Sequence, residues 1–227
     1  MRTNYTIIAK KDPHGVVSEQ YRKLRTSIDY SSFDKKMKVI NITSTLPAEG
    51  KTLTVLNLAM VYAQTKQKVL VVDLDLRKPK INRAFKLSNI GGISEYIKGD
   101  TKIEEHIKHA DDYLDVLVAG EKVPFPAEVL VSSKMKDMFE ELRELYDIVI
   151  IDCPPSSAVA DATIISNLSD GTVFVCASRS TNSNLASDVL KKLKESGANI
   201  LGGVLTQVKK KDIFYGADYY YYYYGEK

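Results

Sequence analysis

Residues 39–52 read Val-Ile-Asn-Ile-Thr-Ser-Thr-Leu-Pro-Ala-Glu-Gly-Lys-Thr, and this stretch decides the fold class. It begins with an apolar, β-branched run typical of a buried strand, and a helical pattern follows it. A loop that ends in Gly-Lys-Thr between a strand and a helix is typical of a phosphate-binding loop. Its backbone N–H groups surround a phosphate, Lys51 reaches the β- and γ-phosphates, and the Thr52 hydroxyl binds Mg²⁺. The general motif begins with glycine where this chain has Thr45, so the interpretation depends on the strand–loop–helix context.

Apolar strand-like runs alternate with helical patterns from residue 39 onward. This alternation indicates repeated βαβ units, and therefore an α/β fold with a mostly parallel central sheet and helices on both faces. The runs at 69–72 and 148–151 are continuously apolar, which predicts central strands. The expected strands are 39–43, 69–73, 114–118, 148–152, 172–177 and 200–205, and the expected helices are 51–65, 133–145 and 182–196.

The two ends of the chain do not follow this alternation of strand and helix patterns. Residues 1–15 read as a loose lead-in, and the following residues Val17, Tyr21, Leu24 and Ile28 form one apolar stripe at helical spacing. We therefore divide the chain into a lead-in and first helix (1–30), a core (31–208) and a basic, tyrosine-rich tail (209–227). A terminal segment of the tail's composition is expected to be mobile.

Length and composition exclude several classes of protein. The chain has 227 residues with 44% hydrophobic and 27% charged residues, which fits one folded domain and neither a disordered chain nor a membrane protein. A net charge of +3 gives no reason to expect nucleic acid as a partner. The two cysteines lie in apolar runs, and no signal sequence or membrane-spanning stretch is apparent, so a cytoplasmic protein with reduced thiols is expected.

Acidic residues end two of the expected central strands. Asp73 and Asp75 follow the run at 69–72, and Asp152 follows the run at 148–151. Ligands of open α/β sheets bind at the carboxyl ends of the strands, so three carboxylates are expected beside the phosphate loop. Carboxylates at this place hold Mg²⁺ and can accept a proton from an attacking hydroxyl. Arg77 could pair with these acids or contact phosphate.

These motifs together resemble the bacterial tyrosine kinases (BY-kinases) of capsular and exopolysaccharide synthesis. The resemblance covers nearly the whole chain. It includes the loop at 47–52, the second Walker motif at 73–77, the Walker B segment ending at 152–155, and the tyrosine cluster at the C-terminus. It also includes the E-x-x-R-x-x-R oligomerisation motif, which Glu19, Arg22 and Arg25 match.

The resemblance implies an ATP- and Mg²⁺-dependent protein-tyrosine kinase that phosphorylates the tail of a neighbouring subunit. By this carry-over Lys51 and Thr52 hold the nucleotide, Thr52, Asp75 and Asp152 hold the metal, and Asp73 accepts the tyrosine proton with help from Asp75. The residues expected around the nucleotide are Thr45, Pro47, Ala48, Glu49, Gly50, Lys51, Thr52 and Leu53. The expected phosphoacceptors are Tyr215, Tyr219, Tyr220, Tyr221, Tyr222, Tyr223 and Tyr224.

The resemblance also implies partners. A ring, an octamer by analogy, is expected from the motif at Glu19, Arg22 and Arg25. In Gram-positive members the kinase is a separate cytosolic chain, activated at the inner face of the membrane by the cytoplasmic tail of a membrane protein. A membrane-anchored activator and an antagonistic tyrosine phosphatase are therefore expected.

Two positions depart from the family pattern. Ala48 replaces the usual loop glycine, which would be costly if the backbone there has a positive φ. Residues 205–207 read Leu-Thr-Gln where the family often has Leu-Asn-Lys, which puts the contact to the base in doubt.

Two other functions fit parts of the sequence. A partitioning or division-site switch ATPase has the same loop, but usually carries a lysine where this chain has Leu46 and has no tyrosine-rich tail. A non-catalytic scaffold would bind ATP only to assemble a ring.

Overall fold

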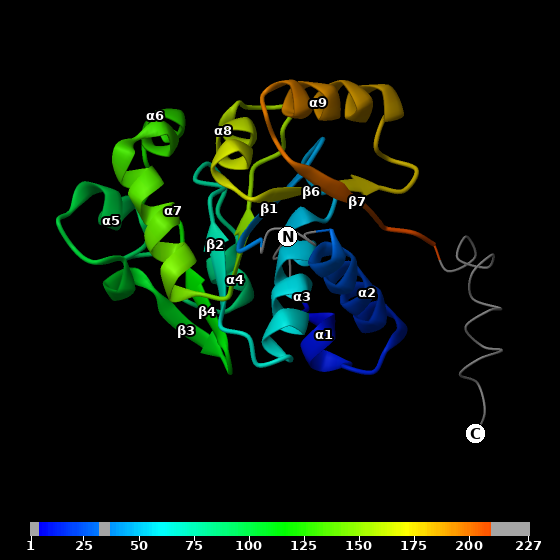
Figure 1. Ribbon diagram of the computed structural model, residues 1–227, viewed down its shortest axis with the longest axis horizontal. Coiled ribbons are helices and arrows are strands. Elements are labelled where there is room, and N and C mark those ends of the chain that lie inside the picture. Colours follow the sequence, from blue (N-terminus) through cyan, green and yellow to red (C-terminus); the bar gives the residue numbers. More distant parts are fainter. Residues whose placement is uncertain (1–4, 32–36, 210–227) are drawn as a thin grey trace.

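A seven-stranded sheet forms the centre of the protein in the computed structural model, which describes residues 5–31 and 37–209. The strand order is β3-β4-β2-β5-β1-β6-β7, and all neighbours pair in parallel except β3 and β4. The mostly parallel sheet confirms the predicted fold class (Figure 1). The strands are β1 (Val39–Ser44), β2 (Val69–Asp73), β3 (Lys108–Asp111), β4 (Leu114–Leu117), β5 (Ile148–Asp152), β6 (Gly171–Ala177) and β7 (Ile200–Thr206).

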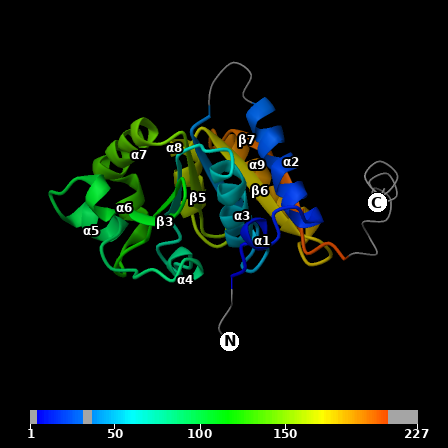
Figure 2. The same cartoon turned by 90° about the horizontal axis from the view of Figure 1, so that it is seen from below.

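Helices cover both faces of this sheet (Figures 1 and 2). Because side chains alternate along a strand, Val69 and Val71 pack against the helices of one face, and Leu70 and Val72 against those of the other. The first face carries α1 (Ile8–Lys11), α2 (Val16–Tyr30), α3 (Lys51–Ala63) and α4 (Ile81–Ala84). The second carries α5 (Ile93–Lys98), the 3₁₀ helix η1 (Ile103–His106), α6 (Pro126–Val131), α7 (Ser133–Leu145), α8 (Asp161–Leu168) and α9 (Ser183–Glu195).

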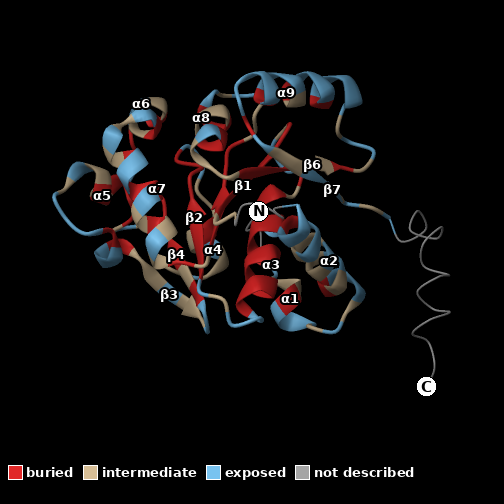
Figure 3. Cartoon of the chain, in the orientation of Figure 1, coloured by how far each residue is buried: buried red, intermediate tan, exposed pale blue. Residues whose placement is uncertain are grey.

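Burial explains why the central elements were predictable. Strands β1, β2 and β5 are buried along their whole length, and α3 is buried on nearly all sides (Figure 3). The outer helices α7 and α9 are amphipathic and begin at capping residues. The Ser132 hydroxyl accepts a hydrogen bond from Met135 N–H, and the Asn182 side chain accepts two at the start of α9. Helix α9 stops before Gly197, whose φ of +101° is left-handed.

Several elements correct the sequence interpretation, which expected none of α4, α5, α6 and α8. The expected loose lead-in contains α1, which is anchored to α3 because Ala9 N–H donates to Asn57 Oδ1 at 2.9 Å and Gln64 Nε2 donates to Ala9 O at 2.8 Å. Strand β3 was not expected; it is a polar, antiparallel edge strand without an apolar run.

Helix α2 packs along α3, but not through the whole predicted stripe. Tyr21, Leu24 and Ile28 lie against the core, whereas Val17 is 50% exposed and Ser18 is buried instead. The tail beyond residue 209, and every predicted phosphoacceptor in it, lies outside the described residues. Within residues 5–31 and 37–209, no helix combines the length and apolar character needed to cross a membrane.

Candidate active site

The phosphate loop connects the end of β1 to the first residue of α3. Two residues of the loop have left-handed backbone, Ala48 at φ +66° and Gly50 at φ +96°. Glu49 folds back within the loop, where its Oε2 accepts a hydrogen bond from Leu46 N–H at 2.8 Å. Lys51 and Thr52 are buried at the start of α3. Both residues therefore lie at the positive end of the helix dipole.

The carboxyl ends of β2 and β5 bring the predicted acids to this helix start. Asp73 and Asp152 pair in register on the neighbouring strands. Lys51 Nζ lies 3.6 Å from Asp75 Oδ2 and 3.9 Å from Asp152 Oδ1, and all three side chains are at least 95% buried. The Thr52 hydroxyl donates to Asp152 Oδ2 at 2.7 Å. The structure thus brings together the lysine, the threonine and the acids that the strand ends predicted.

Charges in this cluster perturb one another strongly. Burial lowers the pKa of Lys51, but the carboxylates of Asp152 and Asp75 outweigh it, so the pKa is raised and the ammonium stays charged. Burial raises the pKa of Asp152, against the lowering effects of Lys51 and of the Thr52 hydroxyl. Burial and the neighbouring Asp152 charge raise the pKa of Asp73 to about 7.

Asp73 also has a structural task. Its Oδ2 accepts hydrogen bonds from Lys80 N–H at 2.8 Å and Ile81 N–H at 2.9 Å, and its Oδ1 accepts from Asp75 N–H at 3.2 Å. These bonds fix the turn after β2 and the start of α4. The carboxylate therefore has a fixed orientation, which is a requirement for a group that handles a proton.

Among the described residues, Arg77 pairs with a fourth acid and not with the three at the strand ends, which was one of its two predicted roles; contact with phosphate stays a prediction. Its guanidinium forms a bidentate pair with Asp161, with Nε–Oδ2 at 2.8 Å and Nη2–Oδ1 at 3.1 Å. Asp161 is 99% buried at the start of α8. The pair therefore ties the loop after β2 to the segment after β5, and so links the two segments that carry the carboxylates.

The remaining loop residues are placed as follows. Pro47, Ala48 and Leu53 are exposed, whereas Thr45 is buried and its hydroxyl has no hydrogen-bond partner among the described residues. The Thr45 carbonyl accepts from Ser157 N–H at 3.2 Å, so the segment after β5 also supports the phosphate loop. Sequence reasoning missed Ser157 and Asp161, because neither belongs to a motif.

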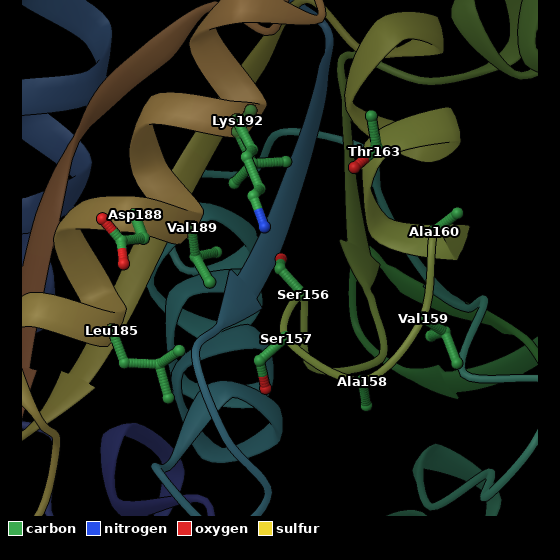
Figure 4. Close-up of a pocket in the computed structure, with 11 residues that line it drawn as sticks. Ser156, Ser157, Ala158, Val159, Ala160, Thr163, Leu185, Asp188, Val189 and Lys192 are labelled. Atoms are coloured by element: carbon green, nitrogen blue, oxygen red, sulfur yellow. The ribbon is translucent and has the colours of Figure 1, made fainter.

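A cavity of about 430 Å³ lies between α9 and the segment after β5 (Figure 4). Lys192 from α9 points toward Ser156, and Asp188 and Thr163 also line the space. None of Lys51, Asp73, Asp75 and Asp152 lines it. We place the candidate active site at the strand ends, because the buried charges converge there.

The cluster fits a magnesium–nucleotide complex. Asp152 Oδ1 is buried and accepts no hydrogen bond within the described part of the chain, so this oxygen is available to a cation or to a water that the cation holds. The described residues contain no group of three or more His, Cys, Asp or Glu side chains that could hold a metal alone. Mg²⁺ commonly binds through one or two carboxylates, waters and the phosphates of its substrate, which agrees with this arrangement.

The fold and the site define a P-loop protein of the nucleotide- and Mg²⁺-binding kind. The AAA domain family matches residues 37–195. The tyrosine-protein kinase YwqD of Bacillus subtilis is 40% identical over 209 residues, which is 92% of this chain and 88% of YwqD. The chain therefore belongs to the bacterial tyrosine-protein kinases.

Solved structures agree with this assignment. The crystal structure of the chimerical protein CapA2B2 matches with a TM-score of 0.86 and 33% identity, covering 90% of each chain. The septum site-determining protein MinD of Pyrococcus horikoshii, solved with Mg-ADP, matches with a TM-score of 0.65 over 77% of this chain and 73% of its own. At 23% identity, the likeness to MinD shows the fold alone.

Proposed function

We propose that the chain transfers the γ-phosphoryl group of ATP to tyrosines in the tail of a neighbouring copy, at Tyr215 and Tyr219–Tyr224. The observation that carries the proposal is the buried cluster of Lys51, Asp75 and Asp152 around the start of α3. A buried ammonium between two strand-end carboxylates is suited to hold the phosphates of a nucleotide together with its metal. The regulated process would be capsular or exopolysaccharide synthesis, as in the family.

Each residue has a separate task in this reaction. Lys51 would hold the β- and γ-phosphates, while Thr52, Asp75 and Asp152 would hold the cation through oxygen atoms. Bound Mg²⁺ supplies positive charge that offsets the charge spread over the transferring group. The peptide N–H groups of the loop would orient the phosphates.

Asp73 would accept the phenolic proton, with Asp75 beside it. The tyrosine Oη–P bond forms while the bond from the γ-phosphorus to the bridging oxygen breaks, and ADP leaves with that electron pair. A phenol has an ordinary pKa near 10, so its proton needs an acceptor as charge leaves the oxygen. Burial and the Asp152 charge raise the pKa of Asp73, which supports this task because a carboxylate with a raised pKa is a stronger base.

Assembly and regulation follow from the family resemblance. We propose a ring of copies, an octamer by analogy, that brings each tail to the next active site. A membrane-anchored activator would recruit the kinase from the cytoplasm to the inner face of the membrane, and a tyrosine phosphatase would reverse the modification. The chimerical nature of the CapA2B2 protein supports a two-component arrangement.

Incubation of the full chain with Mg²⁺·ATP and with the cytoplasmic tail of the activator tests the proposal. A kinase forms phosphotyrosine and releases ADP in equal amounts. A switch ATPase of the partitioning type releases ADP without phosphotyrosine, and a scaffold yields neither product. Asp73→Asn and Asp75→Asn, compared at equal folded content, would identify the proton acceptor, because only its loss should reduce turnover while nucleotide binding is retained.

A further inference from the structure

Two left-handed residues that are far apart in sequence lie in contact beside the phosphate loop. Ala48 has φ +66° and Gln207, just beyond β7, has φ +56°. Gln207 Nε2 donates to the Ala48 carbonyl at 2.8 Å, across 159 residues of sequence. Non-glycine residues adopt such a backbone at a cost and keep it only where the surroundings impose it. These are also positions at which the chain departs from the family pattern.

The neighbouring residue makes a second contact to the same loop. The Thr206 hydroxyl donates a hydrogen bond to the Glu49 carbonyl at 2.5 Å and lies 3.3 Å from the Cys176 carbonyl. Thr206 also closes the space beside Gly50, where an added Cβ would lie only 3.1 Å from Cγ2 and Oγ1 of Thr206. The end of β7 thus contacts residues 48, 49 and 50 in succession.

These contacts determine where the loop N–H groups point. In a trans peptide the C=O and the following N–H point in opposite directions. Because Gln207 binds the Ala48 carbonyl, Glu49 N–H points away from Gln207, and because Thr206 binds the Glu49 carbonyl, Gly50 N–H points away from Thr206. Within residues 5–31 and 37–209, neither of these N–H groups donates a hydrogen bond. Two successive N–H groups that are free to face a ligand can form an anion-binding concavity.

We propose that Thr206 and Gln207 are positioning residues that hold the phosphate loop in its anion-binding shape. They do so by fixing the carbonyls of Ala48 and Glu49, and Gln207 compensates for an alanine at a position that favours glycine. The proposal deepens the proposed function, on which it rests for the identity of the nucleotide. It also implies that the departure from the family pattern at Thr206 and Gln207 affects the binding of the phosphates and not of the base.

The affinity for Mg²⁺·ADP, measured with the full chain, tests this proposal separately from kinase activity. Gln207→Met keeps the side-chain length but removes the donor, and it should raise the Kd by about three- to tenfold. Thr206→Val should raise the Kd at least as much. Thr206→Ser keeps the hydroxyl donor and should bind Mg²⁺·ADP as the wild type does. Gln67→Met is the matched control, because Gln67 also donates a side-chain hydrogen bond, to Thr65 at 3.2 Å, but far from the loop.

A double-mutant cycle distinguishes positioning from general stabilisation. With Ala48→Gly in place, the strain is relieved, so Gln207→Met should change the Kd less than twofold. An unchanged Kd in both Gln207→Met and Thr206→Val would overturn the proposal, as would an equal effect of Gln207→Met with alanine or glycine at position 48. Thermal unfolding without nucleotide reports any loss of folded protein.

If the wild type binds Mg²⁺·ADP but forms no phosphotyrosine, the proposed function fails while this inference stands.

Discussion

Lys51 shows how one residue depends on its surroundings for its charge. A buried ammonium is stable only beside opposite charge, and Asp75 in the loop after β2 and Asp152 at the end of β5 supply that charge. The same arrangement makes the two acids depend on the lysine. Replacing any one of the three therefore affects both binding and stability, and these effects have to be measured separately.

Ala48→Gly is a prediction at the residue scale. The left-handed backbone at Ala48 costs about 1 kcal/mol more for alanine than for glycine, so the substitution should tighten Mg²⁺·ATP binding by several-fold. Lys66→Gly is the matched control, because Lys66 has φ +63° in the turn after α3, away from the site. Calorimetric titration with nucleotide should show tighter binding for Ala48→Gly alone. Equal affinities in all three chains would mean that the strain at Ala48 does not limit binding.

Residue identities at the site were predictable where a loop motif or a strand end fixed them. Lys51 and Thr52 follow from the Gly-Lys-Thr motif, and Asp73, Asp75 and Asp152 from the rule that ligands bind at the carboxyl ends of parallel strands. The partners of Arg77 and Ala48 did not follow, because Asp161 and Gln207 are 84 and 159 residues away and no local pattern marks them. Such contacts become visible only once the chain is folded.

At the scale of elements, buried strands with apolar runs were found from sequence with accurate bounds. Strands β2 and β5 match the expected residues 69–73 and 148–152, because both faces of each are buried and the whole run is apolar. Strand β3 and helix α1 were missed for the opposite reason. Each is four residues long and has too few apolar residues to show a period.

Helix α5 gives a pH-dependent prediction. Partial burial would raise the pKa of Glu95, but hydrogen bonds from Gly92 N–H and the Ser94 hydroxyl, both at 2.8 Å, outweigh it and lower the pKa to about 2. A lowered folded-state pKa contributes stability that is present above the ordinary value of 4.5 and is lost as the pH falls through about 2.

Glu95→Gln should therefore reduce the free energy of unfolding by about 1 kcal/mol at pH 7, with the difference closing near pH 2. Urea unfolding at several pH values measures this. Glu121→Gln is the control, since Glu121 is 61% exposed and pairs only loosely with Lys98 at 3.7 Å. A Glu95→Gln difference that stayed constant with pH would rule out the carboxylate charge as its source.

At the scale of the whole molecule, α2 has to pack within its own chain and to take part in the proposed ring. The charged residues of its predicted oligomerisation motif are not all free at the surface. Arg22 pairs with Glu19 at 2.9 Å, and Arg25 Nη1 donates to the Val61 carbonyl of α3 at 2.9 Å. Arg25 thus fixes α2 to α3, whereas Arg22 donates to the Pro13 carbonyl and forms a partly exposed pair with Glu19.

Substitutions in this motif should separate folding from assembly. Arg25→Ala should lower the free energy of unfolding by about 1 kcal/mol, because the Val61 carbonyl loses its donor, and should also weaken the ring. Arg22→Ala should reduce the assembled mass and, through the lost bond to the partly buried Pro13 carbonyl, lower the free energy of unfolding by no more than Arg25→Ala does. Light scattering coupled to size exclusion, together with urea unfolding, reports both quantities, and Thr26→Ala on the exposed side of α2 is the control. Full-size rings in Arg22→Ala would disprove the proposed role of Arg22 in assembly.

Intact-mass analysis with peptide mapping tests the central claim most directly. The full chain is incubated with Mg²⁺·ATP and the activator's cytoplasmic tail, beside Lys51→Met, which loses the only side chain proposed to hold the β- and γ-phosphates. The account predicts added phosphates confined to Tyr215 and Tyr219–Tyr224 in the wild type, removed by a tyrosine phosphatase and absent in Lys51→Met. Phosphotyrosine at the same level in Lys51→Met, or ADP release with no phosphate on the tail, would contradict it.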